Sequence, residues 1–373
     1  MDSIQVNEQR LVDNFCKLVR IDSSTGKEKL IAEELKRQLA DLGAAVREDD
    51  AGTTFGGNCG NLIAKIPGTK PGPTLLLSAH MDRVEPGQGI NPVITDGIIR
   101  SQGDTILAAD DVAGIAEILE ALRVIKENQL PHVPVEVVFT VAEEGGLKGA
   151  KALDTQQLES TMGFMLDGGG PVGTVTVQAP AQTGITATFH GKSAHAGIAP
   201  EKGINALVAA ALAVAKMKLG RIDEVTTANI GVLTAGQATN IVPDRAVLKG
   251  EARSRNPEKL RAQVEHMVAC INEACSQTGA TVDLDVVDSY PAFQLGEQEP
   301  VVELITTACK QAGIPVQLVG SGGGSDANII NGKGIPCVVL GMGYEDVHST
   351  NESIPTDQLV KGAQLIATLL QIA

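Results

Sequence analysis

The amino-acid sequence predicts an α/β protein with a mixed, mostly parallel sheet flanked by helices, interrupted by an inserted α+β domain. Two observations support this fold class. Helical and strand-like apolar patterns alternate through the first half of the chain and again after residue 300. Between these regions, alternating Thr and Val strands surround a long Ala-rich helix. We therefore expect a first domain made of residues 1–180 and 292–373, with the inserted domain at 181–291.

The individual elements follow from the spacing of apolar residues. Helices show apolar residues at three- and four-residue intervals, whereas residues 74–79 (TLLLSA) are almost wholly apolar, as in a strand covered on both faces. In the first domain we expect helices at 7–19, 27–42, 112–126, 301–312 and 356–372, and strands at 62–66, 74–79, 135–141, 163–166, 316–318 and 337–340. In the inserted domain we expect a helix at 206–218 and strands through 284–287.

Composition excludes several classes of function. The chain has 373 residues, 43% of them apolar, and a formal charge of −15 from 30 Lys and Arg against 45 Asp and Glu. This balance disfavours nucleic-acid or anionic-membrane binding. The N-terminus lacks the apolar core of a signal peptide, and no apolar run is long enough to span a bilayer. The six cysteines form no C-x-x-C pair, which indicates reduced thiols and a cytoplasmic protein.

Five side chains suited to metal binding stand at strand ends or in turns, far apart in the sequence: His80, Asp110, Glu144, Asp167 and His348. A structural zinc site usually gathers its ligands at short spacings, whereas a catalytic site collects them from many strand ends of one scaffold. This scatter predicts an enzyme.

The segments around the first two candidates each have a structural alternative. In SAHMDR, His80 is followed two residues later by Asp82, which could accept the second imidazole N–H and orient the ring, although a His beside an Asp in a turn is also common. In LAADDVAG, Asp110 or Asp111 could simply cap the following helix. A helix start needs only one cap, so the other carboxylate would remain free to bridge two cations.

Paired acids also follow the strand at 135–141. Glu143 and Glu144 repel each other unless cations or solvent relieve the charge. One Glu can bind a metal ion while the other acts as general base. A solvated acidic loop is the alternative. Asp167, in LDGGG, has the weakest signal on its own, because Asp-Gly turns are frequent.

The complete set offers two nitrogen and three oxygen donors. This mixture suits zinc, manganese or cobalt better than calcium or magnesium. Because five ligands exceed the four of a tetrahedral zinc ion, the count favours two metal ions that share a carboxylate and activate water for hydrolysis.

Other known signatures do not explain the chain. There is no H-E-x-x-H motif, and the glycine-rich segment 320–326 (GSGGGSD) lacks the Lys of a phosphate-binding loop and the final Gly of a dinucleotide fingerprint. That segment is either a flexible turn or a backbone that lines a substrate pocket, and Gly323 and Gly324 are its candidate binding residues.

The motifs SAHMD, LAADDVAG, VAEEGG, LDGGGPVG, GKSAHAG, TNIVPD, GGGSDAN and VHSTNE occur in this order along nearly the whole chain. In this order they resemble the two-zinc metallopeptidase family that includes peptidase T, carboxypeptidase G and succinyl-diaminopimelate desuccinylase, and most of all its peptidase T-like tripeptide aminopeptidases. The resemblance implies a zinc-exopeptidase fold whose inserted domain is a dimerisation, or lid, domain. One departure is Val112, where many relatives have Lys.

The resemblance also implies a role for each metal-site residue. Asp110 would bridge the two ions, with His80 and Asp167 on one ion and Glu144 and His348 on the other. Asp82 would orient His80. Glu143 would be the general base that deprotonates the metal-bridging water.

Three residues of the inserted domain resemble substrate-binding residues of the family. His195, in GKSAHAG, would reach the active site of a partner subunit and stabilise the oxyanion. Asn240 and Arg253 would hold the substrate backbone or carboxylate. A structural His and a surface Arg are the alternatives.

The expected function is therefore metal-dependent hydrolysis of short peptides with release of the N-terminal residue, in a homodimer. The family resemblance associates Asp rather than Glu at position 167 with peptide substrates that have a free N-terminus. The alternatives are a deacylase or carboxypeptidase acting on N-acyl amino acids and a non-catalytic metal-binding or scaffold protein.

Overall fold

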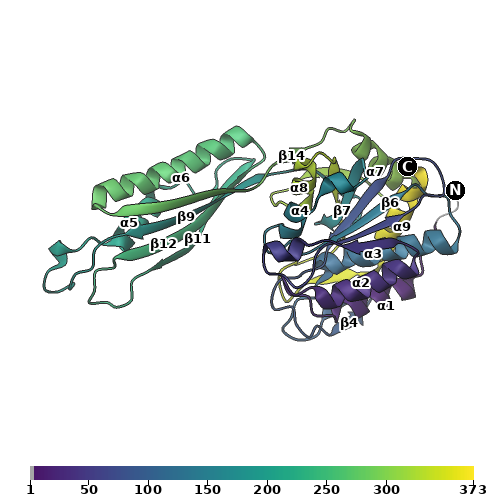
Figure 1. Cartoon of the computed structure of the whole chain (residues 1–373), viewed down its shortest axis with the longest axis horizontal. Helices are drawn as coiled ribbons and strands as arrows, with labels where there is room; N and C mark the ends of the chain where they lie inside the picture. Colours follow the sequence, from purple (N-terminus) through teal and green to yellow (C-terminus); the bar gives the residue numbers. More distant parts are fainter. Residues whose placement is uncertain (1–3) are drawn as a thin grey trace. The chain divides into compact units, whose positions relative to one another are not determined.

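The computed structural model describes residues 4–373, so the first three residues of the predicted first domain lie outside the described part. The chain divides into two compact units (Figure 1). Among the described residues, unit 1 comprises residues 4–177, Gln294–Gly320 and Ser325–Ala373, and unit 2 comprises Gln178–Phe293 and Ser321–Gly324.

The main sheet of unit 1 has the strand order β1-β2-β6-β3-β7-β16-β8-β14, and β15 pairs with β8. Its strands are β1 (Ala45–Glu48), β2 (Leu62–Ile66), β3 (Leu75–His80), β6 (Val135–Thr140), β7 (Met162–Gly168), β8 (Thr174–Ala179), β14 (Phe293–Gln294), β15 (Gln317–Gly320) and β16 (Cys337–Gly341). Strands β6, β3, β7 and β16 run parallel, while β2 and β8 pair with them antiparallel. The predicted α/β class is thus confirmed, and the carboxyl ends of the parallel strands meet at one edge.

Helices cover this sheet, and five of them lie where the apolar spacing predicted helices. They are α1 (Glu8–Val19), α2 (Lys29–Asp41), α3 (Ala109–Glu127), α4 (Lys148–Ala152), α7 (Pro300–Gln311), α8 (Asp326–Gly332) and α9 (Thr356–Ile372), with short 3₁₀ turns η1 (Ala51–Thr54) and η2 (Thr155–Gln157). Helix α3 packs on β3 and β7 and against α1 and α9, whereas α8 packs on β16 and α4 (Figure 1). Every residue of β3 is buried, as expected for a strand between helical layers.

Several short elements were not predicted. Strands β4 (Pro92–Thr95), β5 (Ile98–Ser101) and β17 (Ser353–Pro355) form a small sheet of order β17-β5-β4. Each of these strands has only three or four residues, too few to establish an alternation of apolar and polar positions. Helices α4 and α8 are likewise only five and seven residues long.

Unit 2 is an antiparallel sheet with two helices. Its strands have the order β10-β11-β12-β9-β13. The elements are β9 (Ala181–His190), η3 (Pro200–Lys202), α5 (Ala206–Lys216), β10 (Gly220–Arg221), β11 (Thr226–Ala235), β12 (Arg245–Ser254), α6 (Pro257–Thr278) and β13 (Thr281–Tyr290). Helices α5 and α6 pack on each other and on β9 and β12, around a core that includes Phe189, Leu248 and Ile271.

No helix within residues 4–373 combines the length and apolar character needed to cross a membrane. All six cysteines are buried as free thiols.

A carboxylate without a partner lies inside the helical layer of unit 1. Glu117 of α3 is 1% exposed, and its Oε1 has no hydrogen-bond partner among the described residues. Helix α9 approaches so closely that a Cβ added at Gly362 would collide with this carboxylate. Burial raises the pKa of Glu117 well above its ordinary value.

We expect Glu117→Met to stabilise the protein by about 1–3 kcal/mol at neutral pH, because it removes the desolvation cost of an unpaired polar group. A carboxyl whose folded-state pKa is raised costs stability as the pH rises from its unfolded value, about 4.3, towards the folded one. The gain should therefore be larger at pH 8 than at pH 4. Urea denaturation of both proteins at the two pH values tests this, and a gain that does not grow with pH would contradict the explanation.

Candidate metal centre and catalytic site

The five predicted metal ligands all belong to unit 1 and come from the predicted strand ends. His80 is the last residue of β3, Asp167 lies near the end of β7, and Glu144 follows β6. His348 lies in the loop after β16, and Asp110 lies in the first turn of α3. Because these parallel strands end at the same edge of the sheet, residues up to 268 positions apart in the sequence, from His80 to His348, are brought together.

Asp110 occupies the centre of this group. One of its oxygens, Oδ1, lies 3.0 Å from His80 Nε2, and the other, Oδ2, lies 3.2 Å from His348 Nε2. Each carboxylate oxygen therefore faces a different imidazole. This is the arrangement that a carboxylate shared between two cations requires.

One further carboxylate completes each half. Ligand atoms of His80, Asp110 and Asp167 lie within 4.8 Å of one another, and so do those of Asp110, Glu144 and His348. Glu144 Oε1 lies 2.8 Å from His348 Nε2, and Asp167 Oδ1 lies 3.9 Å from His80 Nε2. These two groups have the membership that the family resemblance implied for two metal ions.

A third possible group contains His80, Glu143 and Glu144. Glu144 thus belongs to two of the three groups, whereas Glu143 belongs to one. The hydrogen bonds of Glu143 among the described residues come from its backbone. Burial, and then the Asp167 carboxylate, raise the pKa of the Glu143 carboxyl well above its ordinary value.

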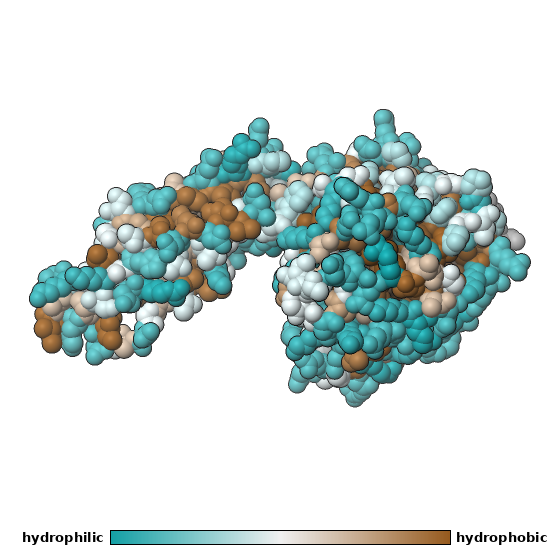
Figure 2. All heavy atoms as spheres, viewed as in Figure 1, coloured by the Kyte–Doolittle hydropathy of each residue, from teal (hydrophilic) through white to brown (hydrophobic). Residues whose placement is uncertain are grey.

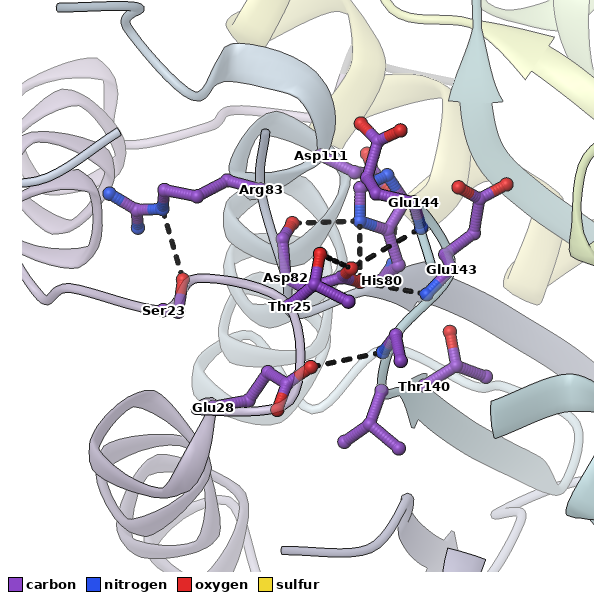
Figure 3. Close-up of polar contacts among 12 residues, drawn as sticks. Ser23, Thr25, Glu28, His80, Asp82, Arg83, Asp111, Thr140, Glu143 and Glu144 are labelled. Atoms are coloured by element: carbon purple, nitrogen blue, oxygen red, sulfur yellow. Dashed lines mark hydrogen bonds and ion pairs between the residues drawn. The ribbon is translucent and has the colours of Figure 1, made fainter. Parts of the chain in front are cut away.

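Asp82 contacts both His80 and the loop that carries Glu143 and Glu144. The nearest acceptor for His80 Nδ1 is the Asp82 main-chain carbonyl oxygen, at 2.9 Å, while carboxylate Oδ1 is 3.5 Å away. The Asp82 carboxylate instead accepts hydrogen bonds from the backbone N–H groups of Glu143 and Glu144, at 2.9 and 3.2 Å (Figure 3). Its side chain therefore supports mainly the loop that carries the two Glu residues.

The idea that Asp110 or Asp111 caps the helix is wrong. Among the described residues, no side-chain hydrogen bond caps α3, and the carboxylates of Asp110 and Asp111 contact His80 and His348 instead. The Glu352 carboxylate accepts hydrogen bonds from the backbone N–H groups of Leu107, Ala108 and Asp110, at 2.8–3.0 Å, and so holds the chain where α3 begins. Glu352 was not among the predicted site residues, although it lies in the motif VHSTNE.

Asp111 has a separate role. Its Oδ2 accepts a 3.0 Å hydrogen bond from the backbone N–H of His80, and its side chain is fully buried. Burial, and then the Asp167 carboxylate, raise the pKa of Asp111 well above the ordinary value. Asp111 thus fixes the backbone of His80, a candidate metal ligand.

The electrostatics of the group fit divalent cations. Burial, followed by the Asp110 carboxylate, raises the pKa of Asp167. Hydrogen bonds with Asp110 and Glu144 raise the pKa of His348 to about 10. For Asp110, burial raises the pKa, but hydrogen bonds from His348 and His80 outweigh it and lower the pKa. Carboxylates and imidazoles crowded in this way hold protons unless positive charge replaces them, and metal ions supply such charge.

Asp326 is a second residue that the sequence analysis did not select. It begins α8, is 4% exposed, and accepts a 2.6 Å hydrogen bond from the Thr140 hydroxyl through Oδ2. Its Oδ1 has no partner among the described residues. Burial raises the pKa of Asp326 to about 6. Asp326 could have been found from the sequence, because it is the acidic residue that ends the glycine-rich segment 320–326.

The predicted substrate residues belong to unit 2. His195 is exposed, and its Nδ1 accepts from the backbone N–H of Gly197 at 3.1 Å. Asn240 is a close neighbour, because its carbonyl accepts from the N–H of Ala196 at 2.9 Å. Arg253 is paired with Glu251 through two hydrogen bonds of 2.7 and 3.1 Å, so that its guanidinium already holds a carboxylate.

Gly323 and Gly324 differ from each other. A Cβ added at Gly324 would collide with the ring of Tyr290, so this glycine permits close packing within unit 2. At Gly323 a Cβ would meet only the Ser321 hydroxyl, at 3.9 Å. Of the two, Gly323 is the one whose surroundings leave room for a ligand.

The chain matches Peptidase family M20/M25/M40 over residues 76–372. It is 46% identical to the uncharacterized protein YqjE of Bacillus subtilis (strain 168), over 99% of both chains. It also resembles two solved structures, each over 98% of both chains. One is the aminopeptidase PepT of Bacillus cereus, with 46% identity and a TM-score of 0.90, and the other is a tripeptidase of Staphylococcus aureus, with 43% identity and a TM-score of 0.94.

These likenesses extend through both units of the fold. They confirm the family resemblance that the ordered motifs predicted. The chain is a member of Peptidase family M20/M25/M40.

Proposed function

We propose that this protein is a metal-dependent aminopeptidase that releases the N-terminal residue of short peptides, tripeptides in particular. The observation that carries the proposal is the Asp110 carboxylate, whose two oxygens face two different histidines. The relatives described as an aminopeptidase and a tripeptidase, at 46% and 43% identity, support the same reaction.

The site would hold two divalent ions, for which we propose zinc, with manganese and cobalt as alternatives. His80, Asp110 and Asp167 would hold one ion, and Asp110, Glu144 and His348 the other. Such ions, when bound, act as Lewis acids and make water a nucleophile near neutral pH. The mixed nitrogen and oxygen donor set fits these metals.

Glu143 would act as the general base. Its carboxyl is adjacent in sequence to a ligand, its backbone is held by Asp82, and its side chain is not engaged in a hydrogen bond with the described residues. It would take a proton from the attacking water and return it to the leaving amine. Asp82 would position this loop.

His195, Asn240, Arg253, Gly323 and Gly324 of unit 2 would bind the substrate. Hydrogen-bond donors such as His195 and Asn240 suit an oxyanion and a peptide backbone, and a guanidinium suits a carboxylate. The pairing of Arg253 with Glu251 means that a substrate carboxylate would have to share or replace this contact.

Removal of the metal tests the central claim. We expect a strong chelator, followed by gel filtration, to abolish hydrolysis of a tripeptide panel read by mass spectrometry, and zinc, manganese or cobalt to restore it. Acetylating the N-terminus of the peptides should prevent cleavage, because the proposed reaction needs a free amine. Undiminished turnover after metal removal would contradict the proposal, and preference for acetylated substrates would indicate a deacylase.

We also propose a cytoplasmic homodimer that associates through unit 2. Figure 2 shows hydrophobic side chains gathered on the surface of this unit. Its exposed large apolar residues are Ile198, Leu207, Val208, Val232, Leu233, Ile241, Val286 and Val287. Apolar surface gathered in this way often marks an interaction site. The buried free thiols suit a reducing compartment.

Sedimentation at several protein concentrations tests the assembly. We expect the mass of two chains, and a shift towards one chain for a Val232→Lys, Leu233→Lys double variant of strand β11. Lysine at these exposed positions adds charge to an apolar surface, which opposes association. A single-chain mass with full peptidase activity would contradict the homodimer.

A further inference from the structure

Three successive backbone N–H groups in the loop after β6 point at buried carboxylates. Ala142 N donates to Glu28 Oε1 at 3.0 Å, and the N–H groups of Glu143 and Glu144 donate to the two oxygens of Asp82. The loop that presents the two Glu residues is therefore held through its main chain (Figure 3). The family assigns a role to Asp82, whereas Glu28 lies before residue 76, where the family match begins.

Glu28 is well suited to this task. Its side chain is completely buried, and Oε1 also accepts from the N–H of Gly26 at 2.8 Å, so that one oxygen joins two segments. Ala142 has φ of 50°, in the left-handed region that costs energy for any residue with a side chain. A strained residue directly before Glu143 persists only if its surroundings fix it, and the Glu28 hydrogen bond does so.

Thr25, three residues before Glu28, also contacts Asp82 and the loop that carries Glu143 and Glu144. The Thr25 hydroxyl donates to Asp82 Oδ2 at 2.7 Å, and a Cβ at Gly145 would collide with the Thr25 methyl group. Residues 25–28 thus touch the loop at both of its ends.

A buried arginine anchors this segment in turn. The guanidinium of Arg83 is bound to Ser23 Oγ at 3.0 Å and to the carbonyl oxygens of Val19 and Ile21 at 2.8 Å each. The Ser23–Arg83 contact is drawn in Figure 3. The segment is consequently fixed to the strand end that bears His80 and Asp82.

We infer that Glu28 is a positioning residue for the hydrolysis reaction, which sets the place of the general base by fixing the main chain at Ala142. The inference rests on the proposed peptidase function. Without the Glu28 acceptor, the Ala142 turn relaxes and the Glu143 carboxylate moves relative to its target. The effect falls on kcat, because the substrate does not contact Glu28.

The test compares three variants of the full chain. Glu28→Met keeps the length of the side chain but removes the acceptor, and Glu28→Gln restores it. The matched control is Glu136→Met. Glu136 is a buried carboxylate on β6, the strand that leads to the Ala142 loop. Its Oε2 also accepts two backbone N–H bonds, from Glu159 and Ser160 at 2.9 Å, but it lies near the end of β6 that is remote from this loop. Both Met variants therefore lose a carboxylate that accepts two backbone N–H bonds, and Glu136→Met also loses the contacts of that carboxylate with the Ser160 hydroxyl and with Lys65.

We expect kcat of Glu28→Met for a tripeptide to fall by about 10- to 100-fold, the range for a misplaced catalytic group, with KM within about threefold of wild type. Glu28→Gln should stay within about threefold of wild-type kcat, and Glu136→Met should lose thermal stability with kcat unchanged. Equal losses of kcat in the two Met variants, or no rescue by Gln, would overturn the inference.

Hydrogen exchange gives a readout that needs no turnover. In peptides covering residues 139–147, Glu28→Met should speed exchange of the amides at 142–144, whereas Glu136→Met should not. Unchanged exchange in Glu28→Met would overturn the inference even if activity fell. If the wild-type protein does not hydrolyse peptides, the proposed function fails, while the exchange comparison still decides whether Glu28 fixes the loop.

Discussion

Replacing Glu143 by Gln should lower kcat for tripeptide hydrolysis by about 10²–10⁴-fold, the contribution typical of a positioned general base. The Gln side chain has the same shape as Glu, and the backbone N–H of residue 143 still donates to Asp82. A side-chain amide, however, cannot take a proton from water. The loop should therefore stay in place while the chemistry stops. Steady-state kinetics, with thermal unfolding to confirm the fold, measure this.

Metal content separates the base from a ligand. Glu143 lies in one possible ligand group with His80 and Glu144, so elemental analysis of Glu143→Gln is decisive. We expect wild-type metal content in this variant and a reduced content in Glu144→Gln, because Glu144 faces His348 at 2.8 Å. Loss of metal from Glu143→Gln with retention in Glu144→Gln would exchange the two roles, and wild-type kcat in Glu143→Gln would remove the base assignment.

Replacing Asp110 by Ala should lower kcat for tripeptide hydrolysis at least as much as Glu143→Gln does. A shared carboxylate contributes an oxygen to each half of the centre, so its removal should weaken binding of both ions and leave His80 and His348 facing an empty position. Elemental analysis should then find less than one ion per chain. Titration calorimetry with zinc would report the lost affinity directly.

Asp111→Asn is the control for this prediction. Asp111 is adjacent in sequence, more deeply buried, and bonded to the backbone N–H of His80, an interaction that an amide oxygen can preserve. Since burial favours the neutral form of Asp111, the uncharged Asn resembles the state already favoured. We expect this variant to keep both ions. If Asp111→Asn loses metal as completely as Asp110→Ala, the centre is not organised around Asp110 alone.

The sequence predicted the edge of the sheet where the site lies because strand ends are visible as apolar runs. The buried run 74–79 leads directly to His80, and GFML leads to Asp167. Once the strands are taken as parallel, their ends must meet. The distances within the group and the partners of Asp82 depend on backbone turns that no periodic pattern reports.

Residues that act by binding main-chain N–H groups could not be predicted from sequence motifs. Glu28 was included in the predicted helix 27–42, yet α2 begins at Lys29, and Glu28 turns inwards to hold Ala142. Glu352 accepts three backbone N–H groups around Asp110, a task that leaves no spacing signature. The small β17-β5-β4 sheet was missed for a related reason, since β17 pairs with β5 across more than 250 residues of sequence.

The contact between His80 Nδ1 and the main-chain carbonyl of Asp82 changes how variants at position 82 should be understood. A carbonyl is present whatever the side chain, so Asp82→Ala leaves the imidazole with its nearest acceptor. The substitution does remove the two carboxylate oxygens that accept hydrogen bonds from the backbone N–H groups of Glu143 and Glu144. Activity lost in such a variant would report the freedom of the acidic loop rather than the orientation of the metal-binding ring.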